Sequence, residues 1–396
     1  MNVLIIANFT HNFDEGLIDG RFNFVAEMLA ARGHKVELVT SDFDHDVKEY
    51  RKPPKQSSYK SIVTYLHEPC YSSNISLRRL WGHYRWGCNV AKYLSTRSKP
   101  DVIYCAVPSL TVGVKAAKYC KRNNIRFIID IQDLWPEAFE MAVNNPLLKK
   151  IFILFKWYVN RIYKSADAII AVSQSYCDIA LAVNKKVNKG CPVYLGNNGE
   201  VYEESFAIPN SSKTEKLSLA YIGTLGYSYD IPCVLKALDI YRKKNNSLPV
   251  RFVVMGIGPL MDEFKGLAYE LGVECEFTGR LPYYEMVSRL IKCDIAVNPI
   301  IKGSVASIIN KVGDYALSGL PVINTQESPE YRSLIERYQC GINCSCGNSN
   351  EVAIAIEKLV SNIELRQEMS INAKRLGNAK FDRRNSYLDI INIIEC

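Results

Sequence analysis

Short apolar segments alternate with helical segments along this chain, and the alternation runs twice. In the first half, strands are predicted at 3–7, 35–40, 62–66, 101–107, 126–131 and 168–172, with helical segments between most of them. Continuous apolar strands separated by helices are typical of a doubly wound parallel sheet, because helices then cover both faces. The first half therefore predicts a Rossmann-like α/β domain.

The alternation stops in a segment rich in Asn, Gly, Pro and Ser, residues 184–216, and then restarts. Strands are predicted at 218–222, 250–255, 274–278, 294–297 and 320–323. We expect a first domain over 1–190, a linker over 191–216 and a second Rossmann-like domain over 217–378, the two facing a cleft. Residues 379–396 are expected to form a helix that either crosses back to the first domain or packs within the second.

Composition narrows the class of protein. The chain has 396 residues, 48% of them hydrophobic and 23% charged, which is typical of a globular protein with more than one core. No apolar run is long enough to span a bilayer, and the start MNVLIIANF lacks the basic segment of a signal peptide. The thirteen cysteines are scattered, and the cluster Cys340, Cys344 and Cys346 fits no zinc pattern well. These features predict a cytoplasmic protein with reduced thiols.

The segment 294–325 carries the most chemistry. A strand is followed by a polar loop, then by a helix predicted from Ile309 to Ser318 that Gly319 ends. Loops at the carboxyl ends of parallel strands are where α/β proteins bind ligands. Lys311 and Asp314 are three residues apart and share one helix face, so they form either a paired cation and carboxylate in a cleft or a solvated surface pair. The polar side chains of the segment are Lys302, Ser304, Ser307, Asn310, Lys311 and Asp314.

Three further strand ends carry glycine. The turns are AYIGTLGYSYD, with Gly223 and Gly226, VVMGIGP, with Gly256, and FTGRLPYYE, with Arg280. Glycine allows backbone amides to approach an anion closely, and a following helix N-terminus adds a favourable dipole. One such turn is ordinary, but several on one edge of one sheet predict a nucleotide pocket.

This series of turns, closed by NKVGDYALSGLPVIN, resembles the donor domain of retaining glycosyltransferases of the family-four type, which have the two-domain GT-B fold. In the first half, RGHKVELVT and DIQDLWPEAF are similar to the same family, closest to its capsule and O-antigen branch. The resemblance implies a transferase that moves a sugar from a nucleoside diphosphate sugar, with uridine as the expected base, to a saccharide acceptor. It implies no other cofactor and no metal.

The resemblance also implies roles for individual residues. The amides of Gly223, Thr224, Leu225 and Gly226 would hold the diphosphate, and Gly256 belongs to the next turn of the donor site. The backbone of Arg280 would meet the base, and Asp314 would accept from the ribose hydroxyls. Lys311 and the loop from Lys302 to Ser307 would lie near the phosphates and the sugar.

In the first domain, Asp130 lies at the end of the predicted strand 126–131 and Asp133 follows that strand, and Asp19 and Gly20 lie in the loop before the first helix; these residues would face the acceptor. Asp133, Lys311 and Asp314 are the catalytic candidates, although Asp133 would equally suit a helix cap. The chain departs from the family pattern in two places. Ala306 stands where a first glutamate is usual, and no Arg or Lys follows Gly226. These departures leave the donor sugar open.

The net charge of +8 is unevenly distributed. No acidic residue lies between Pro69 and Pro100 or between Met141 and Ala166, and both segments carry aromatic residues among their basic ones. They predict either a solvated basic face or a face that docks on an anionic membrane and presents a lipid-linked acceptor. No nucleic-acid-binding module is recognisable. The residues expected on this face are Arg78, Arg79, Arg85, Lys92, Lys149 and Lys156.

Two alternative functions stay open. A sugar-nucleotide 2-epimerase or a phosphorylase can share the fold, but an epimerase would need paired acids and a cleft histidine, and no histidine lies beyond His83. A non-catalytic nucleotide-sugar-binding subunit would explain the missing glutamate and the missing cations of the first turn.

Overall fold

The computed structural model describes residues 1–10, 20–52, 60–73, 76–135, 146–207, 216–244, 248–303 and 308–396, and for 146–152 it describes the backbone. The predicted site residues Asp19, Ser304 and Ser307 lie outside these ranges. The chain divides into two compact units. Unit 1 contains Met1–Tyr194 and Tyr387–Cys396, and unit 2 contains Leu195–Ser386.

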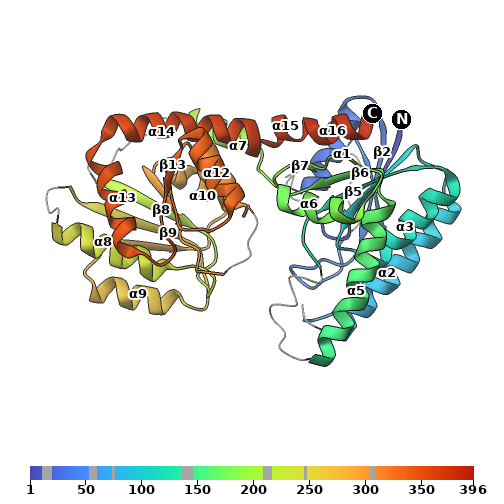
Figure 1. The fold of residues 1–396 in the computed structure, drawn as a ribbon, viewed down its shortest axis with the longest axis horizontal. Helices are drawn as coiled ribbons and strands as arrows, with labels where there is room; N and C mark the ends of the chain where they lie inside the picture. Colours follow the sequence, from blue (N-terminus) through green and yellow to red (C-terminus); the bar gives the residue numbers. More distant parts are fainter. Residues whose placement is uncertain are drawn as a thin grey trace. The chain divides into compact units, whose positions relative to one another are not determined.

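Unit 1 is built on a seven-stranded sheet with the order β3-β2-β1-β4-β5-β6-β7, in which every pairing is parallel (Figure 1). The crossover between neighbouring strands places helices on both faces, as the alternating sequence predicts. Its elements are β1 (Asn2–Ile6), α1 (Arg21–Ala31), β2 (Lys35–Ser41), β3 (Ile62–Leu66), α2 (Leu77–Thr96), β4 (Val102–Val107), α3 (Leu110–Asn123), β5 (Arg126–Ile131), α5 (Pro146–Ser165), β6 (Ala168–Ala171), α6 (Gln174–Val183), β7 (Cys191–Pro192) and α16 (Leu388–Glu395).

Unit 2 repeats the architecture with a six-stranded sheet of order β10-β9-β8-β11-β12-β13, again parallel throughout. The two sheets share the strand order of a doubly wound fold, so the predicted fold class is confirmed. The elements are α7 (Gly199–Ala207), β8 (Leu217–Ile222), α8 (Ile231–Lys244), β9 (Val250–Met255), α9 (Met261–Glu270), β10 (Cys275–Gly279), α10 (Tyr283–Leu290), β11 (Ile295–Asn298), α11 (Lys311–Leu317), β12 (Val322–Asn324), α12 (Pro329–Tyr338), β13 (Gly341–Asn343), α13 (Ser349–Ser361), α14 (Ile363–Leu376), the π-turn η3 (Gly377–Phe381) and α15 (Arg383–Ser386).

The C-terminal helix α16 belongs to unit 1. Its residues Ile390, Ile391 and Ile394 are buried in one cluster with the sheet and with α1. At the helix end, Glu395 accepts from Arg32 at 2.7 Å. Burial of three isoleucines stabilises this docking by roughly 1.5–3 kcal/mol per side chain.

The observed boundaries differ from the expected linker over 191–216. Residues 191–194 belong to unit 1 and the described residues from Leu195 onward to unit 2, where α7 is already formed. The loop-like composition of this segment hid that helix. In the part of the chain that the structure describes, no helix is long and apolar enough to cross a membrane.

Candidate functional site

Two glycine-bearing turns of unit 2 pack directly against each other. Gly223 after β8 has a φ of +127° and Gly256 after β9 a φ of +155°, a region that side chains rarely adopt. A β-carbon on Gly256 would lie 1.9 Å from the carbonyl oxygen of Gly223. The close approach of the two turns therefore requires glycine at 256, and the positive φ favours glycine at 223.

Because of this packing, only two of the four amides that were predicted to hold the diphosphate are available to it. The amides of Gly223 and Leu225 donate to the carbonyls of Met255 and Ile257, each at 3.0 Å, so they serve the fold. In the described residues, the amides of Thr224 and Gly226 make no hydrogen bond. An anion at this turn would therefore meet two backbone donors, and not four.

Lys311, at the start of α11, points its ammonium at the same turn. The residue is only 8% exposed, and Nζ has no hydrogen-bond partner in the described residues. It lies 4.1 Å from the ring centre of Tyr221 and 3.8 Å from that of Tyr229. Desolvation lowers the pKa of Lys311 to about 7, and the charge of Asp314 acts in the opposite direction. A buried cation that has aromatic rings but no hydrogen-bond partner among the described residues is suited to receive an anion.

Asp314, one helical turn further, is held by three donors. Its Oδ1 accepts from the amide of Asn197 at 3.0 Å, from the hydroxyl of Tyr202 at 2.5 Å and from that of Tyr283 at 3.2 Å. A ligand hydroxyl would therefore compete with donors that already hold this carboxylate. The carboxylate thus both faces the site and joins α11 to α7 and α10.

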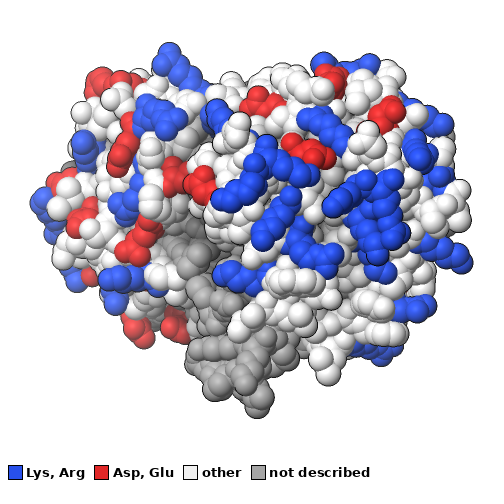
Figure 2. All heavy atoms as spheres, turned by 45° about the vertical axis from the view of Figure 1, so that its right-hand side comes forward, with Lys and Arg blue, Asp and Glu red and all other residues white. Residues whose placement is uncertain are grey.

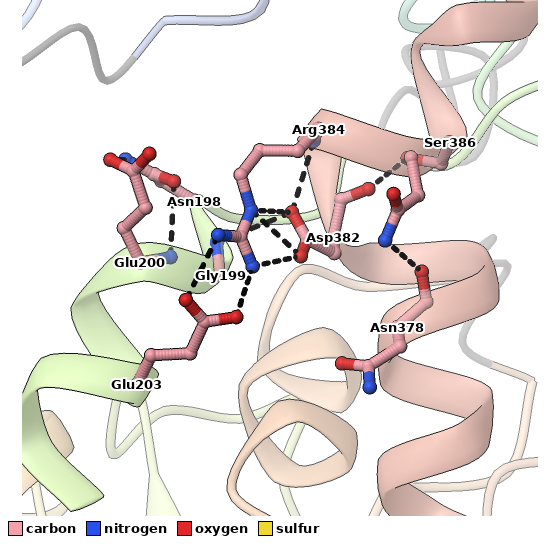
Figure 3. A network of polar contacts seen from close by, with 9 residues as sticks. Asn198, Gly199, Glu200, Glu203, Asn378, Asp382, Arg384 and Ser386 are labelled. Carbon is pink, nitrogen blue, oxygen red and sulfur yellow. Dashed lines mark hydrogen bonds and ion pairs between the residues drawn. The ribbon is translucent and has the colours of Figure 1, made fainter. Parts of the chain in front are cut away.

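The segment that supplies two of these donors, Asn197 and Tyr202, is held in place by Asp382 and Arg384, which follow η3. Asn197 pairs with Asp382 in a parallel bridge. Arg384 donates to Asp382 and to Glu203 of α7, each at 2.6 Å (Figure 3). The residues around Asp314 are therefore positioned by contacts between α7 and the segment that follows η3.

These parts surround a cavity of about 720 Å³. Of the predicted donor residues, the structure brings seven to its walls: Gly223, Thr224, Gly256, Arg280, Asn310, Lys311 and Asp314. Leu225 and Gly226 belong to the first turn but do not line the cavity. Lys302 is exposed and does not line it. The cavity is also lined by Tyr229, Leu281, Tyr283 and Met286, which the sequence does not single out as site residues. Tyr283 lies in the same FTGRLPYYE segment as Arg280, but nothing in its spacing predicts a bond to Asp314.

In unit 1, the predicted role of Asp130 is wrong. The residue is fully buried and forms an ion pair with Arg21 at 2.6 Å. It also accepts from Gln132 at 2.6 Å and from the hydroxyl of Tyr104. Both carboxylate oxygens are used within the core, so Asp130 is a structural residue. Gly20 is buried at the N-terminus of α1, and this conformation places the neighbouring Arg21 on Asp130.

Asp133 lies just beyond β5 and is exposed. Its Oδ1 accepts from the amide of Leu134 at 2.9 Å. Desolvation raises the pKa of this carboxyl, while the hydrogen bond with Leu134 and the charge of Arg79 oppose that rise. Asp133 is thus a carboxylate at the carboxyl edge of the sheet with a hydrogen bond to the next amide, and both of its predicted roles stay predictions.

The basic residues of α2 divide into two groups. Arg78, Arg85 and Lys92 are exposed, as is Lys156 on α5. Arg79 is not on that face: its guanidinium carbon lies 5.8 Å from the ring centre of Phe9 and 5.3 Å from that of Trp135. Arg79 therefore faces the edge of the sheet, which corrects its predicted position. The side chain of Lys149 lies outside the described residues.

The structure adds a third helix to the basic face. Helix α3 packs against both α2 and α5, and all three helices contain Lys and Arg but no Asp or Glu. Turned so that this side comes forward, unit 1 shows more Lys and Arg than Asp and Glu side chains on the surface (Figure 2). Helices α2, α3 and α5 therefore form one acid-free layer, which contains both of the acid-free segments found in the sequence.

Two family models match the chain. Residues 24–187 match the model described as Glycosyltransferase Family 4, and residues 202–376 match the one described as Glycosyl transferases group 1. The chain therefore carries both domains of a glycosyltransferase of the GT-B type. No curated protein sequence matches it.

Solved structures share this architecture at low identity. HepE from Anabaena in complex with UDP is 15% identical with a TM-score of 0.67, covering 100% of this chain and 99% of its own. Sucrose-phosphate synthase from Thermosynechococcus elongatus is 14% identical with a TM-score of 0.65, covering 100% and 98%. WaaG, a glycosyltransferase involved in lipopolysaccharide biosynthesis, is 16% identical with a TM-score of 0.57, covering 98% and 99%. At these identities the likeness concerns the fold.

Proposed function

We propose that the protein transfers a sugar, with retention of configuration, from a nucleoside diphosphate sugar to a lipid-linked saccharide. One observation carries the donor part of this proposal: the buried ammonium of Lys311 has no hydrogen-bond partner in the described residues and lies beside the turn that holds Thr224 and Gly226. Burying an unpaired cation is costly, so its retention at a cavity wall is explained by an anionic ligand.

The donor's diphosphate would bind Lys311 and the amides of Thr224 and Gly226. The backbone at Arg280 would meet the base, and Asp314 would receive the ribose hydroxyls. Uridine is the proposed base, supported by the HepE structures, which are in complex with UDP and with UDP-glucose. The cavity of about 720 Å³ lies within the range of small-molecule sites.

The chemistry needs charge stabilisation at the leaving group. As the bond between the sugar carbon and the diphosphate oxygen breaks, negative charge develops on that oxygen, and Lys311 with the two amides would stabilise it as preorganised donors. The acceptor hydroxyl attacks the same sugar carbon from the leaving-group side and gives its proton to the departing diphosphate. Asp133 would position the acceptor. We propose that this route needs no metal ion.

The acceptor part of this proposal is supported by the acid-free layer of α2, α3 and α5. Each basic residue near an anionic bilayer contributes about 1 kcal/mol, so the exposed Arg78, Arg85, Lys92 and Lys156 could hold the protein on the cytoplasmic surface of a membrane. A surface polysaccharide such as capsule or O-antigen is assembled on lipid carriers, and WaaG acts in lipopolysaccharide biosynthesis. We therefore place the reaction in that class.

A thermal-shift screen against nucleoside diphosphate sugars tests the proposal. A ligand that binds the folded state raises the melting temperature, and UDP-sugars should do so for the wild type. Lys311→Met should weaken that binding on the order of tenfold to a hundredfold, since a charge-assisted contact is lost. Lys236→Met, on the exposed side of α8, is the matched control and should bind as the wild type does. Absence of any shift across the panel would contradict the proposal.

A further inference from the structure

A second cavity, of about 340 Å³, lies in unit 1 between α2, α3 and α5. It is separate from the donor site, and its walls are mostly apolar. They include side chains from all three helices and from the turn after β5: Leu80, Tyr84, Val114, Trp135, Phe155 and Tyr158. An apolar cavity of this size is in the range that binds small ligands or part of a longer chain.

Exposed tryptophans flank this cavity on two helices. Trp81 of α2 is 55% exposed and stacks at 5.7 Å on Tyr84, which lines the cavity. Trp157 of α5 is 52% exposed and lies 5.1 Å from Tyr158, which also lines it. Large exposed aromatic residues are costly in water and are typical of the interface between a bilayer and water.

An arginine guanidinium lies over the ring of each of these tryptophans. Arg85 lies 5.8 Å from the ring centre of Trp81, and Arg161 lies 4.7 Å from that of Trp157. Arginine stems pack on apolar surface while their charge stays with water or with phosphate groups. The rim therefore matches a surface that is apolar inside and anionic outside.

Two further cations stand at the cavity itself. Lys115 lines it; the described contacts of its Nζ are the Sγ of Cys88 at 3.1 Å and the ring of Tyr84 at 5.7 Å, and no described carboxylate pairs with it. The guanidinium of Arg79 lies 5.3 Å from the ring centre of Trp135, and its Nε donates to His83 at 3.3 Å. His83 and Trp135 both line the cavity, so Arg79 lies against its wall.

From this arrangement we infer that the cavity binds the first part of the apolar chain of a lipid phosphate, with the phosphate held by Lys115 and Arg79. The inference rests on the proposed glycosyl transfer and deepens it, because it identifies where the acceptor's lipid carrier binds. Asp133 follows Gln132 and directly precedes the turn that carries Trp135. A saccharide attached to a phosphate at Arg79 would thus extend toward the carboxyl edge of the sheet, where Asp133 lies.

The binding of a long-chain polyprenyl phosphate in detergent tests this assignment. Val114→Trp fills the cavity from α3 and should weaken binding on the order of tenfold or more. Lys118→Trp adds the same side chain on the exposed side of α3 and should bind as the wild type does. Equal binding by both variants would overturn the assignment, because adsorption on the basic face alone would then explain it.

The phosphate is tested separately from the chain. Lys115→Gln should weaken the polyprenyl phosphate roughly tenfold and leave the uncharged polyprenol of the same length unchanged. Lys121→Gln, exposed on the same helix, should alter neither. If Lys115→Gln weakened both ligands equally, or neither, the phosphate contact would be wrong.

A measurement on the unaltered protein guards against a variant that fails to fold. A polyprenyl phosphate with a diazirine near the phosphate end of its chain should crosslink to α2, α3 or α5 at cavity residues; crosslinks elsewhere would contradict the inference. The UDP-sugar thermal shift is recorded in parallel on every variant. A normal shift without lipid binding rejects the lipid site alone, whereas no shift at all rejects the proposed function.

Discussion

A β-carbon built on Gly223 would lie 2.8 Å from the Nζ of Lys311, so the glycine and the ammonium meet at one wall of the unit 2 cavity. A side chain at this position would take the space that the ammonium occupies, and its φ of +127° would strain any other residue. The turn and the cation therefore form one anion-binding arrangement.

The first prediction concerns the dependence of stability on pH. The pKa of Lys311 is about 7 in the folded protein, below its ordinary value of 10.5. Between these values the unfolded chain binds more protons, so this residue makes the free energy of unfolding rise with pH from about 7 to 10.5. Lys311→Met should remove that rise and, below pH 7, stabilise the ligand-free protein on the order of 1–4 kcal/mol.

Chemical denaturation of the wild type and of Lys311→Met at several pH values measures this effect. Subtracting one free energy of unfolding from the other cancels the titration of the groups that both proteins share. Curves that run parallel between pH 7 and pH 10 would show that Lys311 is not desolvated as described.

The second prediction separates the two roles of Asp314. Asp314→Asn keeps an oxygen for Tyr202 and Tyr283 but removes the charge, so donor affinity should fall roughly tenfold with little loss of stability. Asp314→Ala leaves buried donors unpaired and should cost a further ~1–3 kcal/mol of folding free energy. Calorimetry with the donor and thermal melts distinguish the variants. Unchanged donor binding in Asp314→Asn would remove Asp314 from the site.

The third prediction tests the packing of the two turns. Gly256→Ala places a β-carbon 1.9 Å from the oxygen of Gly223 and should destabilise the fold by roughly 1–3 kcal/mol or more. Gly266→Ala, inside α9 with no atom within 4 Å of the new carbon, is the matched control and should stabilise by up to ~1 kcal/mol. Equal unfolding midpoints would refute the described contact.

The fourth prediction concerns the basic face. Replacing Arg85, Lys92 and Lys156 by glutamine should weaken flotation with anionic vesicles, most clearly at low salt. Glutamine at Lys236 and Lys265 of unit 2 is the control and should leave flotation unchanged. A basic face that is merely solvated would give no difference between the two sets.

The fifth prediction concerns metal. Because the charge of the leaving diphosphate is assigned to Lys311 and two amides, transferase activity should survive an excess of EDTA. Its loss, with recovery on addition of a divalent cation, would require a metal ion in the mechanism.

Much of the fold could be predicted because its signals are local. Apolar strands, glycine after helices and their alternation each extend over a few residues, and together they indicated both parallel sheets. The predicted orientation of Lys311 and Asp314 onto one helix face was equally local, since it depends on helical periodicity.

The misassigned residues depend on contacts that spacing does not encode. Asp130 and Asp133 are three residues apart, but Asp130 lies within β5 and is paired with Arg21 in the core, whereas Asp133 lies beyond the strand at the surface. Arg78, Arg85 and Lys92 repeat every seven residues and share a face, whereas Arg79 lies about 100° further around the helix. Helix α3 belongs to the acid-free layer because it packs against α2 and α5, and residue spacing does not predict that packing.

The most direct test is the structure of the protein crystallised with a UDP-sugar. Our expectation is that the diphosphate contacts the ammonium of Lys311 and the amides of Thr224 and Gly226, with the ribose at Asp314. A diphosphate bound anywhere else in the protein, with Lys311 still enclosed by Tyr221 and Tyr229, would contradict it.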